Sequence, residues 1–499
     1  MVTALCMSVV AASPSGASAK TGGSSSLTIG LPSDPAPQGY DPLKYSSGQR
    51  LFYEALYNSL FVEGPKGQSE PSLAASYALS QGNTVATIQL EPGVAFSDGT
   101  PLDANAVVAN LNRRGEAGLV AYTAFATGGA SAITSVSATG ADTVVITFAS
   151  AQTSFASELT GEPGMIVNPN DFNSLGQAPA GSGPYVLKSA IRGSSYVLAK
   201  NPKAWHASQY SYQTITYKAI TTAQALANAV VSGQVDIAAL PDTSTVSFLK
   251  AQHVGLRSVR GAVVLFADWD INGLTAKPLG NLKVRQAFQL AINRNKLVDG
   301  LHPGDAATAN AFPPGSEGYD PKLDAQWAYN PAKAKELLKQ AGYPHGFTFS
   351  TVALPGSGLA DEEAVANQLA AVGITMKIVT ATSTAQLFAA TNTEPLGYFS
   401  FTWPTDPIGG VTGVFVGGFG NPHHEMNAAV DSALTAAEGA SGKAEVTALT
   451  QLNDALVDQG WLYPMYQQET YVAFNAHKVA PPTFPGSDPF PLLSTIKPA

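Results

Sequence analysis

Cysteine is almost absent from this sequence, because Cys6 is the only one in 499 residues. Beyond that position the chain can form no disulfide, no thiolate metal site and no cysteine nucleophile. The scarcity also suits an oxidising compartment, where a spare thiol is a liability. Charge is scarce as well, with 13% charged and 45% apolar residues. This composition is typical of a folded globular protein with a sparsely charged surface.

Basic runs are missing too, and the net charge is −9. Proteins that bind nucleic acid usually carry a basic patch or stripe, so nucleic acid is not an expected partner. The acidic balance mildly favours a cationic or neutral ligand. A chain of 499 residues is longer than one hydrophobic core normally organises, which is about 250–300 residues. We therefore expect two or three lobes.

No stretch is long and apolar enough for a membrane span, which takes about 20 residues. The apolar run at residues 2–12 is short and is followed by small residues ending in Ala17-Ser18-Ala19. Such a run is typical of a secretory signal, so residues 1–19 are predicted to be a signal peptide that exports the protein. Its positively charged start is missing, which suggests truncation. Lipid anchoring at Cys6 stays open, although Leu5 fits a lipobox poorly.

Strand and helix patterns alternate along the rest of the chain, after a Gly/Ser-rich linker at residues 20–26. Residues 27–31 alternate like a strand, and residues 284–298 have the spacing of one amphipathic helix. Strands are expected at residues 347–352 and 374–379, on either side of a helix at 361–372. Asp103 and Asn330 are expected to cap helices. With no short repeat, this alternation favours α/β lobes.

A set of short motifs then occurs in one order along residues 27–479. The most specific is Phe96-Ser97-Asp98-Gly99-Thr100-Pro101, which continues to Ala104 and a helix. Others are Gly181-Ser182-Gly183-Pro184-Tyr185, Lys200-Asn201-Pro202, Gly233-Gln234-Val235-Asp236-Ile237, Val284-Arg285-Gln286-Ala287, Ala291-Ile292-Asn293-Arg294 and Tyr329-Asn330-Pro331. Together they closely resemble the family 5 extracellular solute-binding proteins, the peptide and nickel receptors of ABC importers.

The resemblance implies an α/β fold: a two-lobed clamshell of the periplasmic-binding-protein type II, with three structural domains. Domain I would be discontinuous, at residues 27–48, 179–260 and 475–499. Domain II would be residues 49–178 and domain III residues 261–474. The lobes would close by a hinge motion at the chain crossings near Arg260 and Phe474.

The same resemblance implies the function. The protein would be a monomer without a cofactor that captures an oligopeptide- or dipeptide-like solute in the periplasm or on the outer face of the membrane. It would deliver this solute to the permease subunits of an ABC transporter, and would be membrane-associated through them or through a lipid anchor.

Asp406 is the candidate anchor for a peptide's amine, because an ammonium out of water needs a carboxylate partner. The family carries a W-x-x-D segment here, whose Asp grips the amine in peptide receptors. In this sequence the segment reads Trp403-Pro404-Thr405-Asp406-Pro407 and is shortened. Asp406 could therefore match either that anchor or a following D-P pair, which would only form a turn.

Five aromatic residues are further candidates for contact with the solute. Trp403 begins the W-x-x-D segment, and Phe266 and Trp269 lie where the family's strand enters domain III. Tyr40 and Tyr45 follow the first strand, where domain I meets the cleft. Trp269 also stands between two aspartates, and an aromatic wall with nearby acids suits a cationic or amphipathic ligand. Ordinary packing between the lobes is the alternative.

Several residues of these motifs are expected to be structural. Arg285 and Arg294 should pair with carboxylates or cap carbonyl groups near their helix, and Asp236 should tie down a loop. His423-His424-Glu425 is not predicted to bind metal, because adjacent histidines point in different directions and no second histidine cluster supports them.

Other functions stay open. Trp403 and Trp269 could stack on the rings of an oligosaccharide, and a nickel or opine-type solute would also suit the fold. A hydrolase is less expected, since a Gly-x-Ser-x-Gly motif is absent and no histidine pairs with an acid in a family-like way. No catalytic residue is predicted.

Overall fold

The computed structural model describes residues 26–44, 49–64, 68–114, 133–149, 151–152, 155–177, 179–314, 316–353, 358–381, 386, 390, 392–403, 407–416, 420–440, 442–485 and 490–499. Within these ranges no helix has both the length and the apolar character needed to cross a bilayer.

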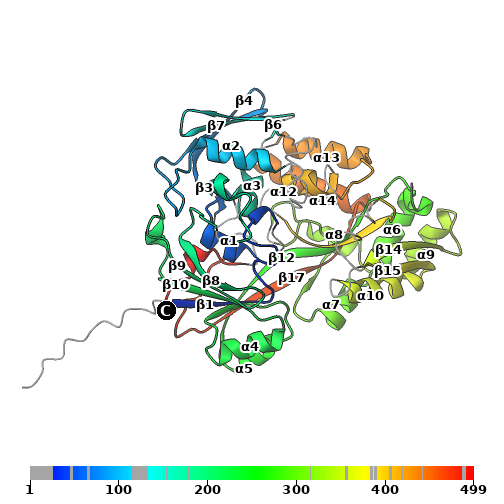
Figure 1. Cartoon of the computed structure of the whole chain (residues 1–499). Coiled ribbons are helices and arrows are strands. Elements are labelled where there is room, and N and C mark those ends of the chain that lie inside the picture. Colours follow the sequence, from blue (N-terminus) through cyan, green and yellow to red (C-terminus); the bar gives the residue numbers. More distant parts are fainter. Residues whose placement is uncertain are drawn as a thin grey trace, which may run out of the picture.

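One nine-stranded sheet joins the beginning, middle and end of the chain. Its strands are β1 (Ser26–Leu31), β8 (Tyr185–Ile191), β9 (Ser195–Lys200), β10 (Thr214–Ala219), β11 (Ile237–Ala239), β12 (Gly255–Asp268), β13 (Ala306–Ala307), β16 (Leu396–Thr402) and β17 (Leu462–Phe474). The order is β16-β12-β17-β11-β1-β10-β9-β8, with β13 paired to β17. Figure 1 shows the long strands β12 and β17 side by side in this sheet. Neighbours in space are therefore often distant in sequence.

Three smaller sheets complete the strands. They are formed by β2 (Phe61–Glu63) with β3 (Ser69–Pro71), by β4 (Ala74–Ser80), β5 (Val85–Leu90), β7 (Thr143–Phe148) and β6 (Ile133–Thr139), and by β14 (Phe347–Ala353) with β15 (Ile374–Thr380). The last pair is parallel, and α10 (Leu359–Ala370) connects its strands. The predicted strand–helix–strand unit in this part of the chain is confirmed.

Helices pack around these sheets. Their bounds are α1 (Arg50–Leu56), α2 (Ala104–Arg113), α3 (Phe155–Glu158), α4 (Ala223–Val231), α5 (Val246–Ala251), α6 (Leu282–Ala291), α7 (Arg294–Leu301), α8 (Pro321–Gln326), α9 (Pro331–Gln340), α12 (Pro407–Gly410), α13 (Ala428–Glu438) and α14 (Lys443–Asp458). A wider helical turn, η7 (Val411–Val416), follows α12. The predicted caps are present: Asp103 accepts from Ala106 N, and Asn330 accepts from Lys333 N, both at 3.0 Å.

The single helix predicted over residues 284–298 is wrong, because two helices occupy this stretch. α6 ends at Ala291, and α7 begins at Arg294. Asn293 explains the break: its side-chain oxygen accepts a hydrogen bond from Lys296 N at 3.0 Å and so caps a new helix. Apolar residues at helical spacing cannot show by themselves where one helix ends and the next begins, because the spacing can continue across the break.

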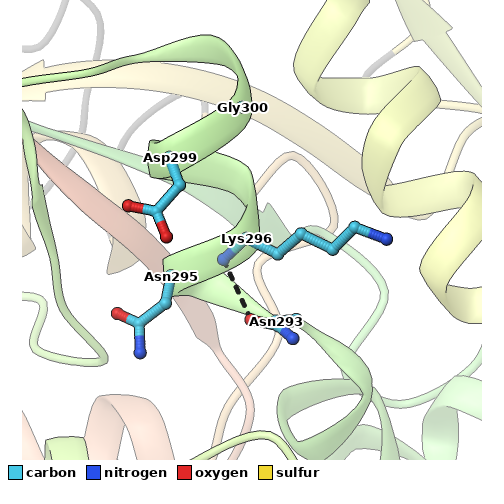
Figure 2. A pocket seen from close by; sticks show the side chains of 5 residues that line it. All are labelled: Asn293, Asn295, Lys296, Asp299 and Gly300. Carbon is cyan, nitrogen blue, oxygen red and sulfur yellow. Dashed lines mark hydrogen bonds between the residues drawn. The ribbon is translucent and has the colours of Figure 1, made fainter.

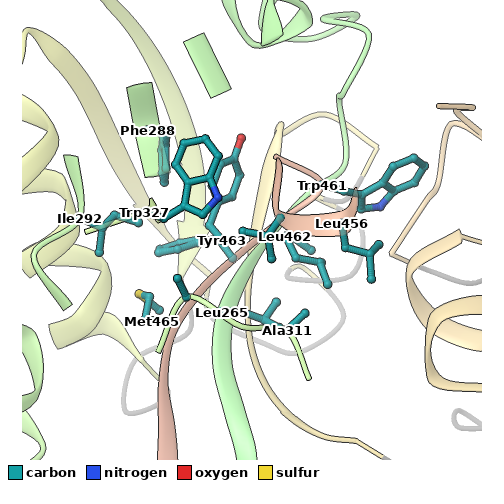
Figure 3. Close-up of a cluster of buried hydrophobic side chains, with 14 of the residues drawn as sticks. Leu265, Phe288, Ile292, Ala311, Trp327, Leu456, Trp461, Leu462, Tyr463 and Met465 are labelled. Atoms are coloured by element: carbon teal, nitrogen blue, oxygen red, sulfur yellow. The ribbon is translucent and has the colours of Figure 1, made fainter. Parts of the chain in front are cut away.

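In the part of the chain that the structure describes, buried apolar side chains form four clusters. The largest draws on residues 263–466 and packs against β12 and β17 (Figure 3). A second uses residues 27–57, 165–237 and 472–496, a third residues 60–166, and a fourth residues 226–249 with Ala473. The domain boundaries proposed from the sequence stay predictions.

Two long strands link the first and second of these clusters. β12 and β17 pair from Gly255 opposite Phe474 to Ala267 opposite Leu462. Their register shifts between Arg260 and Val263, because two β12 residues oppose one residue of β17 there. Such a bulge bends a strand and increases its twist locally. β12 and β17 therefore form one two-stranded ribbon with two irregular points near its middle, the second of them between Val264 and Leu265.

A buried ion pair ties the segment after β1 to α2. Nη2 of Arg113 lies 2.5 Å from Asp41 Oδ1, and the two side chains are only 3% and 8% exposed. The Arg113 guanidinium also lies 4.7 Å from the ring centre of Phe172. Because both charges are out of water, each depends on the other for compensation.

We expect Arg113→Ala to lower the free energy of unfolding by about 3–5 kcal/mol, because it leaves the Asp41 carboxylate buried without its partner. Urea titration followed by circular dichroism measures this loss. Arg257→Ala, at an exposed position on β12, is the control and should change the free energy by less than about 0.5 kcal/mol. Equal effects from both variants would contradict a structural role for the pair.

Candidate functional site

Four aromatic side chains form a ladder along β16. Phe399, Phe401 and Trp403 are alternate residues on this strand and its end, so they share one face. Phe415 from η7 packs against all three, with ring centres 6.2, 5.1 and 5.5 Å away. Phe401 and Trp403 are 4.9 Å apart and edge to face. We call these four residues the aromatic ladder.

Trp269 extends the ladder at its other end. Its ring lies edge to face with Phe399 at 5.9 Å. The ring also covers Gly397, where an added Cβ would lie 1.9 Å from Trp269 Cζ2, so only glycine leaves room for the indole. The structure thus brings together two predicted site residues, Trp269 and Trp403, which are 134 positions apart in the sequence.

Phe266 lies on the opposite face of the sheet. Its ring contacts Tyr398 at 5.7 Å and Phe288 at 6.3 Å, within the largest apolar cluster. Tyr398 and Phe399 are neighbours on β16 and therefore point to opposite faces. Phe266 is consequently separated from the aromatic ladder by the sheet itself.

Tyr40 belongs to the second apolar cluster, where it contacts Phe52 at 6.3 Å and Tyr196 at 6.5 Å. Burial raises the pKa of the Tyr40 hydroxyl. Tyr40, Phe266, Trp269 and Trp403 are at most 4% exposed, so protein atoms cover these rings in this structure. Tyr45 and Asp406 lie outside the described residues. A solute-binding role for all six stays a prediction.

β16 is also an edge of the nine-stranded sheet. It pairs with β12 from Leu396 opposite Asp268 to Thr402 opposite Ala262. On its other side, no strand of the described chain pairs with it. About half of its backbone hydrogen-bonding groups thus face away from β12, and one of them, the Leu396 carbonyl, accepts from the Thr351 hydroxyl at 3.1 Å. An outer edge of this kind is the usual template for adding an extended chain. Phe399 and Phe401 are half-buried beside this edge.

Sequence reasoning missed Phe399, Phe401 and Phe415, although one signal was present. Phe399, Phe401 and Trp403 place aromatic rings at alternate positions, which is a strand pattern. Phe415 carried no comparable signal, because it reaches the ladder from a separate turn.

The two aspartates that flank Trp269 are engaged within the protein. Asp268 accepts hydrogen bonds from Asp270 N at 2.9 Å and from the Tyr463 hydroxyl at 3.0 Å. Asp270 accepts from the backbone and hydroxyl of Thr275 at 2.9 and 2.8 Å. These carboxylates therefore hold the turn after β12. Burial raises the pKa of Asp268 from 3.8 to about 8.

The His423–Glu425 segment has a structural role. Oε2 of Glu425 accepts a hydrogen bond from Asn272 N at 3.2 Å, and the Asn421 side chain bonds both the N–H and the C=O of Glu425. Burial raises the pKa of the Glu425 carboxyl. Across the described parts of the chain, no group of three or more His, Cys, Asp or Glu side chains could hold a metal ion.

The motif arginines cap carbonyl groups, as expected. Arg285 donates to the carbonyls of Gln459, Ile271 and Leu279 at 2.7–2.9 Å, and Arg294 donates to those of Pro464 and Trp327 at 2.7 and 2.9 Å. Asp236 accepts from Thr28 N at 2.8 Å and from Lys478 Nζ at 2.7 Å, and so joins β1 to the C-terminal segment.

A separate hollow of about 600 Å³ lies beside α7, lined by Asn293, Asn295, Lys296, Asp299 and Gly300 (Figure 2). It contains no predicted site residue and no aromatic ring. Most of its side chains are exposed, which is typical of a shallow surface depression.

The chain is similar in sequence to proteins of known family. The model described as "Bacterial extracellular solute-binding proteins, family 5 Middle" matches residues 68–420. A glutathione-binding protein of Pectobacterium atrosepticum is 30% identical over 333 residues, covering 65% of this chain and 63% of that protein. The chain thus matches somewhat less than two thirds of the length of these curated relatives.

Solved structures resemble almost the whole chain. The binding protein AgaA of A. tumefaciens R10, in complex with agropinic acid, superposes with a TM-score of 0.78 at 21% identity, covering 95% of this chain and 99% of that one. The dipeptide-binding protein of Pseudoalteromonas sp. SM9913, in complex with Met-Leu, superposes with a TM-score of 0.76 at 20% identity, covering 95% and 100%. The predicted α/β fold of this class is confirmed.

Asp268 makes stability depend on pH. Between 3.8 and about 8, the folded protein keeps a proton on Asp268 that the unfolded chain has released. The free energy of unfolding should therefore fall as pH rises through this window, by up to about 1.4 kcal/mol per pH unit. Urea titrations at several pH values should give a shallower slope for Asp268→Asn than for the wild type. The exposed Asp299→Asn is the control, and identical slopes for both variants would contradict the assignment.

Proposed function

Since this chain belongs to the bacterial extracellular solute-binding proteins of family 5, we propose that it captures an oligopeptide-like solute outside the cytoplasmic membrane for an ABC importer. Family membership confirms the resemblance that the motifs indicated. It also makes the protein a solute-binding protein and not an enzyme, as predicted. Delivery to permease subunits, export by the signal peptide and the class of solute belong to the proposal.

The observation that supports the peptide assignment is the outer edge of β16, beyond Leu396, with which no strand of the described chain pairs. An extended peptide can add to such an edge, where main-chain hydrogen bonds supply affinity and side-chain pockets supply selectivity. The aromatic ladder, with Phe399 and Phe401 half-buried, would form an apolar wall beside that peptide. A receptor for varied peptides benefits from this arrangement, since every peptide offers the same backbone.

Asp406 is the proposed anchor for the peptide's amine. It follows Trp403, the last ring of the ladder, by three residues. A peptide lying along β16 would therefore bring one end close to this part of the chain. Trp269 and Trp403 are proposed to support the wall from behind, and Tyr40, Tyr45 and Phe266 remain weaker candidates for contact.

The relatives support a small solute derived from amino acids. The curated relatives bind glutathione, and the two solved structures hold agropinic acid and Met-Leu. An opine-type solute is thus the nearest second candidate. A nickel site gains no support from the described residues, which offer no metal-binding group. An oligosaccharide would need exposed ring faces, whereas Trp269 and Trp403 are covered.

A thermal-shift panel tests the solute class. Glutathione, Met-Leu, tetra-alanine, agropinic acid and maltotetraose should separate the candidates, because a ligand at 100 times its Kd stabilises the fold by about 2.7 kcal/mol. We expect the free peptides to raise Tm. Tetra-alanine methylated at alternate amide nitrogens should raise it far less, since strand addition needs those N–H groups. A shift with maltotetraose alone would contradict the peptide proposal, and equal shifts with both tetrapeptides would contradict pairing along β16.

Replacement of Asp406 tests the amine anchor. Asp406→Ala should weaken binding of a free-amine peptide at least tenfold, because an ammonium at the site would lose its counter-charge. N-acetylation of the peptide should weaken binding to the wild type in the same way. Isothermal titration calorimetry measures both effects, with the exposed Asp242→Ala as the control. Unchanged affinity in Asp406→Ala would assign this residue to a turn instead.

A further inference from the structure

The loop after α7 connects the two parts of the molecule that β12 and β17 join. Thr243, between β11 and α5, donates its hydroxyl hydrogen to the Pro303 carbonyl at 3.2 Å. Its methyl group lies 3.9 Å from where a Cβ on Gly304 would stand. α5 belongs to the fourth apolar cluster and α7 to the largest one. We call Thr243, Pro303 and Gly304 the brace.

The loop is held firmly on its own side. His302 Nε2 lies 2.6 Å from Asp361 Oδ1, on α10, and its ring stacks on Tyr466, on β17, at 4.4 Å. The hydroxyls of Tyr398 and Tyr466 donate to Asp361 Oδ2 at 2.6 and 2.8 Å. Despite burial, these hydrogen bonds lower the pKa of Asp361, so the carboxylate stays charged.

A second contact fixes the loop to the crossing strands themselves. Asp305 Oδ1 accepts a hydrogen bond from Glu469 N at 2.8 Å. Glu469 lies opposite Arg260, next to the point where the register of β12 and β17 shifts. The loop is therefore anchored beside the first of the two register shifts of the ribbon, where the strand bends.

The brace and the aromatic ladder lie on opposite faces of the sheet. Tyr398 points toward Asp361 and the loop, whereas Phe399 and Phe401 point toward Phe415. In Figure 1, α5 and α7 lie below β12 and β17, while α12 and α14 lie above them. Rotation about the crossing strands that separates the lobes on the ladder side must press them together on the brace side.

We propose that the brace is a contact behind the crossing strands that stabilises the open arrangement of the lobes until solute binds. The proposal rests on the proposed function only in placing the solute on the ladder side. Contacts made across the back of the ribbon improve on opening and are lost on closure. They therefore set the fraction of molecules that is closed before solute arrives, and a smaller closed fraction lowers the apparent affinity.

The expected size of the effect follows from the contact. Because one hydrogen bond stabilises the open arrangement only modestly, removing it should raise the closed fraction about two- to tenfold. Apparent affinity for a solute that binds the closed arrangement should rise by the same factor.

Distances between two spin labels test this without any solute. A Cys6→Ser background leaves no native cysteine, so labels at Ser76→Cys on β4 and Ser432→Cys on α13 report one distance between the lobes. Both positions are exposed. Electron–electron double resonance on solute-free protein should show a larger short-distance population in Thr243→Ala than in the wild type. Thr221→Ala, exposed on the same lobe, is the matched control and should not differ from the wild type.

A second variant tests the proposal even if the hydrogen bond between Thr243 and Pro303 is too weak to change the measured distance. An indole does not fit between residue 243 and Gly304, so Thr243→Trp should push the lobes apart behind the ribbon and also shorten the measured distance. Unchanged distances in both variants, or a longer distance in either, would overturn the proposal. Because no solute is present, this outcome is independent of whether peptides bind at the ladder.

Discussion

The pairing of β12 with β17 is the interaction on which the rest of the molecule depends. These strands run between two large apolar clusters, and their pairing is regular except at two register shifts, between Arg260 and Val263 and between Val264 and Leu265. Their backbone hydrogen bonds are cooperative, so the ribbon resists fraying, while the two neighbouring register shifts bend it within one short stretch. Two bodies joined in this way can rotate relative to each other without unfolding.

β12 also positions the candidate site on one side and the brace on the other. Through β16 it holds the aromatic ladder on one face, and Tyr398 and Phe266 on the opposite face. Side chains alternate along a strand, so the ladder and the brace lie on opposite faces of the ribbon. A rotation that brings the lobes together on the ladder face therefore moves them apart on the brace face. The β12–β17 ribbon would therefore couple solute capture to the position of the lobes in the solute-free protein.

Sequence patterns predicted much of the fold and several local hydrogen bonds. The caps Asp103 and Asn330 and the strands β14 and β15 followed from residue type and spacing. For Arg285 and Arg294 the sequence left carboxylates and carbonyl groups as alternatives, and the structure shows carbonyl groups. The patterns failed at residues 284–298, where one helix was predicted but Asn293 caps the second of two helices. They also grouped Phe266 with Trp269, although only Trp269 reaches the ladder.

By itself, the sequence determined the family, the α/β class and the places where caps and turns must form, because these depend on local residue chemistry and motif order. Only the tertiary structure decided which side chains meet. Phe415 joins β16 from a separate turn, Asp361 receives hydroxyls from two strands, and Thr243 touches Pro303 across 60 residues. Such contacts depend on the path and twist of the whole chain, which no local spacing encodes.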